Sequence, residues 1–157
     1  GAKQGSRTRR IRPQGLLIIV LGGVLIRIFR TNHGLAVHSP VLEGVGVILF
    51  VSGLGLAVWA RIHLGRNWGM PMTEKDEPEL VTSGPYRFIR HPIYSGILLA
   101  ILGTALATDL YWLIVFGVSS VYFVYSATVE ERLMTTSFPT AYPGYRAKTK
   151  MLIPFVL

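Results

Sequence analysis

The sequence predicts an all-α membrane protein, a polytopic bundle of about four transmembrane helices. Half of its 157 residues are apolar and only 15% are charged, whereas soluble proteins carry about 25% charged residues. A soluble domain of this length could not bury so much apolar surface. The apolar residues are concentrated in four segments with basic residues between them. That pattern is typical of a chain that crosses a bilayer several times.

Four apolar segments are the predicted spans. A hydrocarbon core of about 30 Å requires about 20 helical residues. The second and fourth segments have that length, whereas the first and third are short and need interfacial residues to complete a crossing. The four segments are 16–29, 41–60, 93–108 and 110–128.

The predicted organisation is a single membrane domain, 1–157, with long connections on one side only. A loop of about thirty residues without structure of its own is longer than usual, which indicates a function. The third and fourth spans form a tight antiparallel hairpin that turns at Asp109. In order, the parts are a basic arm (1–15), two N-terminal spans (16–60), a loop (61–92), the helical hairpin (93–128) and a tail (129–157).

The basic residues predict the orientation of the chain in the membrane. Of the 16 Lys and Arg residues, all except Arg27 and Arg30 fall in the arm, the loop or the tail. Because Lys and Arg concentrate in cytoplasmic segments, we expect both termini and the long loop to be cytoplasmic. The net charge is +8, but the basic residues flank apolar segments and form no stripe of their own. We therefore expect the lipid bilayer, and no nucleic acid, as a partner.

Metal and thiol chemistry are not predicted. The chain has no cysteine, which excludes disulfides, thiolate catalysis and thiolate metal sites. His33 and His38 have no third ligand nearby in the sequence, so they indicate no metal site.

Two charged pairs lie at the ends of the predicted hairpin. Arg90 and His91 precede Pro92, which suits the first turn of a helix because its missing N–H costs nothing there. Basic side chains and free N–H groups at a helix N-terminus form an anion site. Glu130 and Glu131 follow the fourth span, where adjacent carboxylates are unfavourable unless they are solvated or bind a cation. Because the spans are antiparallel, we expect the two pairs to be neighbours that hold a zwitterionic ligand.

The tail adds an aromatic surface to these charges. Phe138, Tyr142 and Tyr145 are spaced four and three residues apart, which places them on one face of a short helix. A zwitterionic ligand with an aromatic part would match the whole set.

The second part of the chain, 41–157, resembles the isoprenylcysteine carboxyl methyltransferase family and the related phospholipid methyltransferases. The resemblance depends on the order and spacing of several short motifs. The matching residues are Leu64, Gly65, Trp68, Leu80, Val81, Thr82, Gly84, Pro85, Tyr86, Arg90, His91, Pro92, Tyr94, Gly96, Glu130, Glu131, Leu133, Phe138, Tyr142, Tyr145 and Pro154.

This resemblance implies S-adenosyl-L-methionine as the cofactor, held at the cytosolic face of a helical membrane fold and enclosed by the cytosolic loop and the C-terminal segment. No Rossmann glycine fingerprint is present, and the family does not use one. The resemblance makes His91, Arg90 and Glu130 the candidate catalytic residues. The implied cofactor-binding residues are Leu80, Val81, Gly84, Tyr86, Arg90, His91, Pro92, Tyr94, Gly96, Glu130, Glu131, Tyr142 and Tyr145.

The sequence leaves the identity of the methyl acceptor open. The acceptor is expected to be lipid-borne or apolar, because it must reach a site at the bilayer surface. A prenylcysteine-type carboxylate needs no base, whereas a lipid amine needs one, for which His91 and Glu130 are the candidates. In the eukaryotic prenylcysteine enzymes basic residues precede the acidic pair, but the segment 123–128 of this chain has none.

Two other functions fit parts of the pattern. Sterol-type membrane reductases that use NADPH resemble this family around an Arg-His-Pro-x-Tyr element, although the pair Glu130 and Glu131 would repel the 2′-phosphate of NADPH. A non-catalytic membrane scaffold could keep the fold without the chemistry. Ligand binding separates the three hypotheses.

Overall fold

The computed structural model describes residues 39–67 and 79–155, together with Gly22, Gly23 and Arg27. The chain divides into two compact units, Gly1–Leu35 and Ala36–Leu157. In the first unit the three described residues are helical. Most of the predicted span at 16–29 lies outside the described residues, and the single-domain organisation stays a prediction.

Helix α2, Pro40–Leu64, is the second predicted span extended at its C-terminal end. It begins with a proline at its first position, where the absent N–H is not needed. The helix continues past Ala60 and ends at Gly65, whose φ of +53° is a conformation that favours glycine. A short 3-10 turn, η1 (Gly65–Asn67), follows. The loop predicted from residue 61 therefore starts several residues later.

Helices α3, Pro92–Ala107, and α4, Trp112–Ser137, form an antiparallel hairpin. Pro92 occupies the first turn of α3, as the sequence predicts. Asp109 closes the hairpin turn, since its carboxylate accepts a hydrogen bond from the Tyr111 amide at 2.9 Å. Helix α4 extends beyond Thr128 to Ser137, so Glu130 and Glu131 lie within the helix and not after it.

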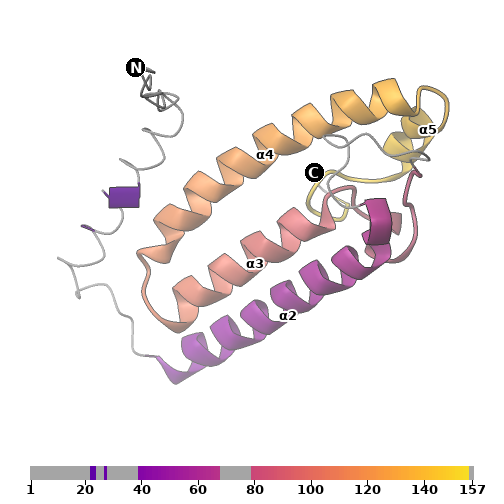
Figure 1. The fold of residues 1–157 in the computed structure, drawn as a ribbon. Helices are drawn as coiled ribbons and strands as arrows, with labels where there is room; N and C mark the ends of the chain where they lie inside the picture. Colours follow the sequence, from indigo (N-terminus) through magenta and orange to yellow (C-terminus); the bar gives the residue numbers. More distant parts are fainter. Residues whose placement is uncertain (1–21, 24–26, 28–38, 68–78, 156–157) are drawn as a thin grey trace, which may run out of the picture. The chain divides into compact units, whose positions relative to one another are not determined.

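Close backbone contact joins α2 to α3, which lies between α2 and α4 (Figure 1). Gly46 faces Gly103 and Gly53 faces Gly96, at the same seven-residue spacing on both helices. A Cβ on Gly53 would lie 2.5 Å from the Ala100 nitrogen and the Gly96 oxygen, so no side chain fits there. Small residues let helices approach in lipid, where van der Waals packing replaces the hydrophobic effect as the driving force.

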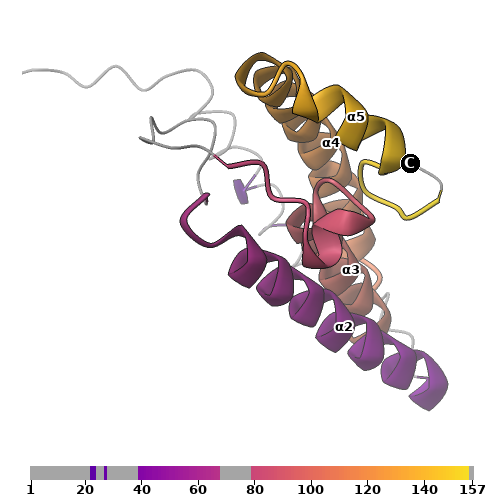
Figure 2. The same ribbon diagram turned by 90° about the vertical axis from the view of Figure 1, so that its right-hand side faces the viewer.

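The remaining elements gather beyond the N-terminal end of α3 (Figure 2). They are a 3-10 turn, η2 (Gly84–Arg87), and a short helix, α5 (Ala141–Lys148). Ile89 and Lys150 form a parallel β-bridge, in which the Arg90 amide donates to the Lys150 carbonyl at 2.8 Å. The segment after α5 is therefore fixed beside the residues that lead into α3.

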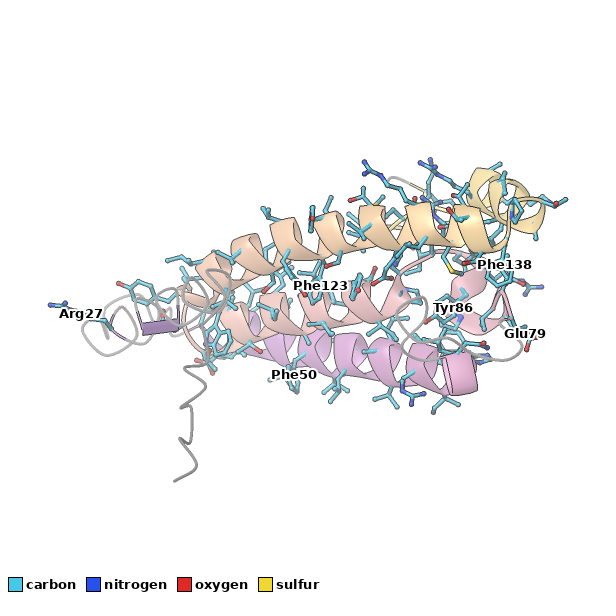
Figure 3. All side chains as sticks on the ribbon, turned by 45° about the horizontal axis from the view of Figure 1, so that its top comes forward. Arg27, Phe50, Glu79, Tyr86, Phe123 and Phe138 are labelled. Atoms are coloured by element: carbon cyan, nitrogen blue, oxygen red, sulfur yellow. The ribbon has the colours of Figure 1, made fainter. Side chains whose placement is uncertain are left out.

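Helices α2 and α4 expose apolar side chains along their length (Figure 3). Both are long and apolar enough to cross a membrane, and few of their residues are buried. Ile48 on α2 is 66% exposed and Val121 on α4 is 73% exposed. The core helix of a soluble protein would bury such side chains, whereas a lipid-facing helix exposes them. The chain is an integral membrane protein, with the shorter apolar helix α3 packed beside these two.

Candidate active site

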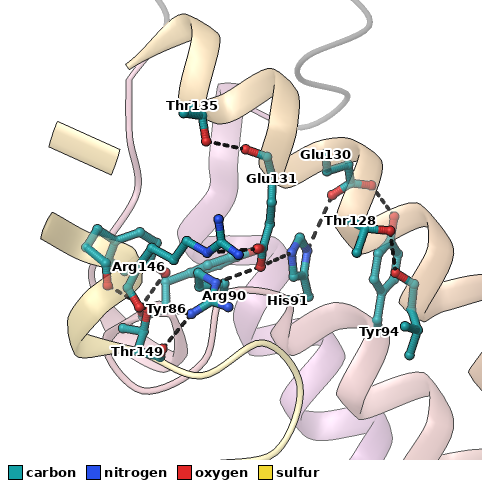
Figure 4. A network of polar contacts seen from close by, with 12 residues as sticks. Tyr86, Arg90, His91, Tyr94, Thr128, Glu130, Glu131, Thr135, Arg146 and Thr149 are labelled. Carbon is teal, nitrogen blue, oxygen red and sulfur yellow. Dashed lines mark hydrogen bonds and ion pairs between the residues drawn. The ribbon is translucent and has the colours of Figure 1, made fainter. Parts of the chain in front are cut away.

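A cavity of about 690 Å³ lies where α3 begins and the last turns of α4 pass beside it. Its wall also includes the end of α2, the chain before η2, and α5. The hairpin accounts for this arrangement, because it returns the C-terminal half of α4 to the N-terminal end of α3. The two charged pairs predicted to be neighbours are neighbours, and Figure 4 shows them in contact.

Arg90 and Glu131 form a buried ion pair with 2.7 Å between Nε and Oε1. Their side chains are only 8% and 4% exposed. The Nη1 group of Arg90 also donates to the carbonyl oxygens of Thr149 and Arg146, next to the end of α5. A buried charge requires a partner and further hydrogen bonds. Arg90 thus ties α4 to the C-terminal segment, and its charge is already matched by Glu131 (Figure 4).

His91 lies between the two carboxylates. Its Nδ1 is 3.4 Å from Glu130 and its Nε2 is 3.4 Å from Glu131. Nε2 is buried and has no well-aligned hydrogen-bond acceptor among the described residues. Burial by itself would lower the pKa of His91, but hydrogen bonding and charge from Glu130 and Glu131 raise that pKa above its usual value of 6.5. The site therefore favours the imidazolium form of His91.

Tyr94 connects Glu130 to the aromatic side chains of the bundle. Its hydroxyl donates a hydrogen bond to Glu130 Oε1. Its ring is stacked between His91, at 5.6 Å, and Phe123, at 4.5 Å between ring centroids. Glu130 has a side chain that is 33% exposed and lines the cavity, so it is held from two sides and still accessible to a ligand.

Helix α5 covers the cavity with two tyrosines. The hydroxyl of Tyr145 donates a hydrogen bond to the carbonyl oxygen of Tyr86 at 2.7 Å. The Tyr145 ring contacts the Tyr142 ring edge to face. The chain beyond α5 is fixed by its β-bridge and by the Ser95 hydroxyl, which donates to the Leu152 carbonyl at 2.6 Å. Phe138, expected on the same helix as the tyrosines, instead caps α4.

Two tyrosine hydroxyls are available to a ligand. Tyr86 and Tyr142 are buried residues that line the cavity, and within the described part of the chain neither hydroxyl has a hydrogen-bond partner. Burial and nearby carboxylate charge raise the pKa of Tyr142 to about 12 and that of Tyr86 well above its usual range. Both hydroxyls stay protonated at neutral pH and can donate a hydrogen bond.

Most of the residues predicted for the site line this cavity. Four do not line it, and each of these contributes to the packing or ion pairing of the fold instead. Glu131 is buried behind the wall in its ion pair, and Pro92 is buried in the first turn of α3. Gly96 contacts Gly53 of α2, and Gly84, at φ +58°, lies against the His63 ring. The predicted residues that line the cavity are Leu80, Val81, Tyr86, Arg90, His91, Tyr94, Glu130, Tyr142 and Tyr145.

One wall of the cavity was not predicted. It belongs to the part of α4 that precedes Glu130 and Glu131. Tyr122, Ser126 and Val129 are spaced four and three residues apart there, so they lie on one face of the helix. In the sequence, the polar groups of Tyr122, Tyr125 and Ser126 within an apolar span could have indicated this wall. The other lining residues outside the prediction are Leu64, Asn67, Glu79, Ile93, Tyr125, Leu133 and Met134.

Comparison with known proteins supports the predicted family. The sequence profile of the phospholipid methyltransferases matches residues 42–141. The cobalt-zinc-cadmium resistance protein CzcN of Cupriavidus metallidurans is 33% identical over 74% of this chain and 50% of its own length. Methanethiol S-methyltransferase 1 of Bradyrhizobium diazoefficiens is 32% identical over 52% of this chain and 28% of its own length. The chain thus spans half or less of these two relatives.

Two further matches concern prenylcysteine enzymes. A probable protein-S-isoprenylcysteine O-methyltransferase of Oryza sativa is 28% identical over 71% of this chain and 61% of its own length. The eukaryotic intramembrane Ras methyltransferase ICMT has a similar fold, with a TM-score of 0.66. That match covers 95% of this chain and 55% of the ICMT chain at 23% identity, so it shows the fold alone.

Proposed function

The chain belongs to the phospholipid methyltransferase family, and we propose that it transfers a methyl group from S-adenosyl-L-methionine to a lipid-borne or apolar acceptor. The observation that carries this proposal is the cavity in which Arg90, His91 and Glu130 meet beneath the tyrosines of α5. Its volume of about 690 Å³ falls within the ~300–1,000 Å³ of small-molecule sites.

The lining residues fit the chemistry of this cofactor. The carboxylate of Glu130 suits its ammonium or ribose hydroxyls, and the hydroxyls of Tyr86 and Tyr142 are placed to donate to its polar groups. Apolar and aromatic side chains of the wall, such as Leu80 and Tyr145, suit the adenine ring. When bound, S-adenosylmethionine supplies an already activated methyl group on sulfonium.

The protein's own part is to position groups, exclude water and move a proton. Positioning and desolvation account for much of the rate when the methyl donor is already activated. Arg90 and Glu131 hold α5 and the C-terminal segment over the cavity and thereby exclude water. Glu130, accessible and hydrogen-bonded to Tyr94, is the group that accepts a proton from an acceptor, with His91 beside it.

The membrane orientation is part of the proposal. The basic arm, the long loop and the tail carry most of the Lys and Arg residues, which favours placing them in the cytoplasm. The loop residues before η2, the start of α3 and α5 all line the cavity. The site would then open at the cytosolic face, where a lipid-borne acceptor meets a soluble cofactor.

The reductase and scaffold hypotheses receive less support. A 2′-phosphate of NADPH requires a cation, but the described cations at the cavity, Arg90 and His91, are both matched by carboxylates. A scaffold does not need a ligand-sized cavity lined by buried tyrosines and a charged network.

Calorimetric titration of the purified protein with S-adenosylhomocysteine, with NADPH in a parallel titration, tests the proposal. We expect saturable binding of S-adenosylhomocysteine and none of NADPH. Binding of NADPH alone would overturn the proposal in favour of the reductase. If folded protein bound neither compound, the scaffold hypothesis would gain support.

A further inference from the structure

The residues that follow α5 form a segment, 150–155, whose side chains have no part in the proposed methyl transfer. The carbonyl oxygen of Lys150 accepts a hydrogen bond from the Arg90 amide at 2.8 Å. Leu152 is buried, and its carbonyl oxygen accepts a hydrogen bond from the Ser95 hydroxyl at 2.6 Å. The backbone of this segment is thus fixed beside the first turn of α3.

Large apolar side chains near this segment are exposed. Phe155 is 88% exposed, and Ile153 and Phe88 are each about half exposed. Phe88 lies beside the segment, because its carbonyl oxygen accepts a hydrogen bond from the Lys150 amide at 3.2 Å. Exposed apolar clusters of this kind mark contacts with a membrane or a protein. These side chains lie near the end of α3 at which the apolar helix begins, and aromatic residues are frequent at that boundary of a bilayer.

Basic side chains accompany these apolar ones. Arg87 precedes Phe88, while Lys148 and Lys150 lie at the end of α5 and just after it, and all three basic residues are exposed. The sequence has no Asp or Glu after Glu131. Positive charge and exposed apolar groups together match a partner that is both anionic and apolar. The residues that form this basic-aromatic surface are Arg87, Phe88, Lys148, Lys150, Ile153 and Phe155.

We propose that the basic-aromatic surface binds the headgroups of anionic phospholipids. Its three cations attract the negative headgroup, and its aromatic and aliphatic side chains enter the boundary between headgroups and acyl chains. The bound lipid is distinct from the methyl acceptor, because no residue of this surface lines the cavity. An anionic phospholipid without an amine, such as phosphatidylglycerol, is therefore a sufficient partner. This binding does not depend on the proposed methyl transfer.

Bound lipid also affects the cofactor site through the backbone. Thr149 lies between Lys148 and Lys150, and its carbonyl oxygen accepts a hydrogen bond from Arg90 Nη1. A headgroup that holds the two lysines stabilises the position of this carbonyl group and hence of Arg90, which lines the cavity. Two ligands that favour the same arrangement of a protein raise each other's affinity. This second part of the inference rests on the proposed function.

Nanodiscs of two lipid compositions test the inference: phosphatidylcholine alone, and an equal mixture of phosphatidylcholine and phosphatidylglycerol. The thermal unfolding temperature is measured in both without cofactor. We expect a higher temperature in the mixture, because a ligand that binds only the folded state stabilises it. The difference should shrink at high salt, which screens exposed charges. Equal temperatures in both compositions, or the same rise when inorganic phosphate is added to phosphatidylcholine nanodiscs, would overturn the inference.

Variants at Lys150 localise the effect. Lys150→Gln removes one cation of the surface, Lys150→Arg keeps the charge, and Arg132→Gln removes an exposed cation of α4 outside the surface. We expect the rise in unfolding temperature with phosphatidylglycerol to shrink in Lys150→Gln and to persist in the other two variants. A full rise in Lys150→Gln, or an equal reduction in Arg132→Gln, would overturn the inference. The unfolding temperature in phosphatidylcholine alone shows that each variant folds.

Titration with S-adenosylhomocysteine in the same nanodiscs tests the coupling to the cofactor site. We expect at least ~5-fold higher affinity in the mixture, the lower end of typical coupling, and loss of this gain in Lys150→Gln. Equal affinity in both compositions would overturn the coupling. If S-adenosylhomocysteine bound in neither composition while phosphatidylglycerol still raised the unfolding temperature, the proposed function would be overturned and the lipid site would stand.

Discussion

At the scale of single residues, two adjacent carboxylates have different environments. Glu130 is 33% exposed at its side chain, lines the cavity and accepts the Tyr94 hydrogen bond. Glu131 is 4% exposed and faces Arg90, with His91 and Arg146 within 3.5 Å. Successive residues on a helix point about 100° apart. This rotation directs Glu130 to the cavity and Glu131 to the ion pairs with Arg90 and Arg146.

Neutralising the two carboxylates one at a time separates these roles. Glu131→Gln leaves the buried Arg90 without its charge partner, and breaking such a pair costs about 3–5 kcal/mol of unfolding free energy. We expect this variant to unfold at a clearly lower temperature and, because α5 is loosened, to bind S-adenosylhomocysteine weakly. Glu130→Gln should lose turnover and binding but keep its unfolding temperature. Thermal unfolding and calorimetry of both variants measure the difference.

An unchanged unfolding temperature in Glu131→Gln together with lost S-adenosylhomocysteine binding would identify Glu131 as a direct ligand contact.

His91 makes stability depend on pH. Its folded pKa is raised by Glu130 and Glu131 above the unfolded value of about 6.5, so the folded state binds the proton more tightly. The resulting stabilisation is fully present below about pH 6.5 and is lost as the pH rises through the folded pKa. We expect the thermal unfolding temperature to fall from pH 6 towards pH 9 in the wild-type protein and to change less in His91→Gln. Parallel pH profiles that coincide would exclude His91 as the source.

At the scale of elements, two glycine pairs set the contact between α2 and α3. The close approach at Gly53 leaves no space for a Cβ, whereas the neighbouring Gly55 has no other atom within 4 Å of such a Cβ. This contact fixes the position of α3, whose first turn carries the site residues. The packing of α2 against α3 therefore supports the geometry of the site.

Gly53→Ala and Gly55→Ala form a matched pair that tests this contact. The added methyl group on Gly53 would force the backbones of α2 and α3 apart, and overpacking of this kind costs about 1–3 kcal/mol. We expect Gly53→Ala to lower the unfolding temperature and Gly55→Ala to leave it nearly unchanged. Equal unfolding temperatures in the two variants would show that the helix contact adapts without cost. Thermal unfolding in the same detergent is the measurement.

At the scale of the whole molecule, the exposed apolar faces of α2 and α4 define a protein that lipid surrounds. The cavity lies towards the ends of these helices, and its wall includes the N-terminal end of α3 and the tyrosines of α5. A site at the boundary of the apolar region suits the proposed transfer, because a lipid-borne acceptor and a water-soluble cofactor could both reach it.

The proposed orientation can be tested directly because the chain contains no cysteine. Thr108, at the hairpin turn, and Lys148, at the end of α5, are both exposed. If the positive-inside rule holds here, a membrane-impermeant maleimide should label Thr108→Cys in intact cells. Lys148→Cys should be labelled only after the membrane is permeabilised. The reverse labelling pattern would invert the orientation and place the site on the outer face.

Sequence alone determined the features that depend on local patterns. The length and apolarity of the segments predicted α2, α3 and α4, because helix formation in a membrane depends on a continuous apolar run. Pro92 and Asp109 indicated where α3 begins and where the hairpin turns. The antiparallel hairpin then placed Arg90 and His91 near the acidic pair, and the motifs identified the family.

Only the tertiary structure decided how these groups interact. Arg90 binds Glu131 instead of presenting an empty anion site, because α4 continues past its apolar run and turns Glu131 inward. The bond from Arg90 to Thr149 and the bridge from Ile89 to Lys150 join residues about sixty positions apart. The α4 wall at Ser126 likewise depends on which helix face meets the cavity. Such contacts are set by distances between elements, which local sequence patterns do not contain.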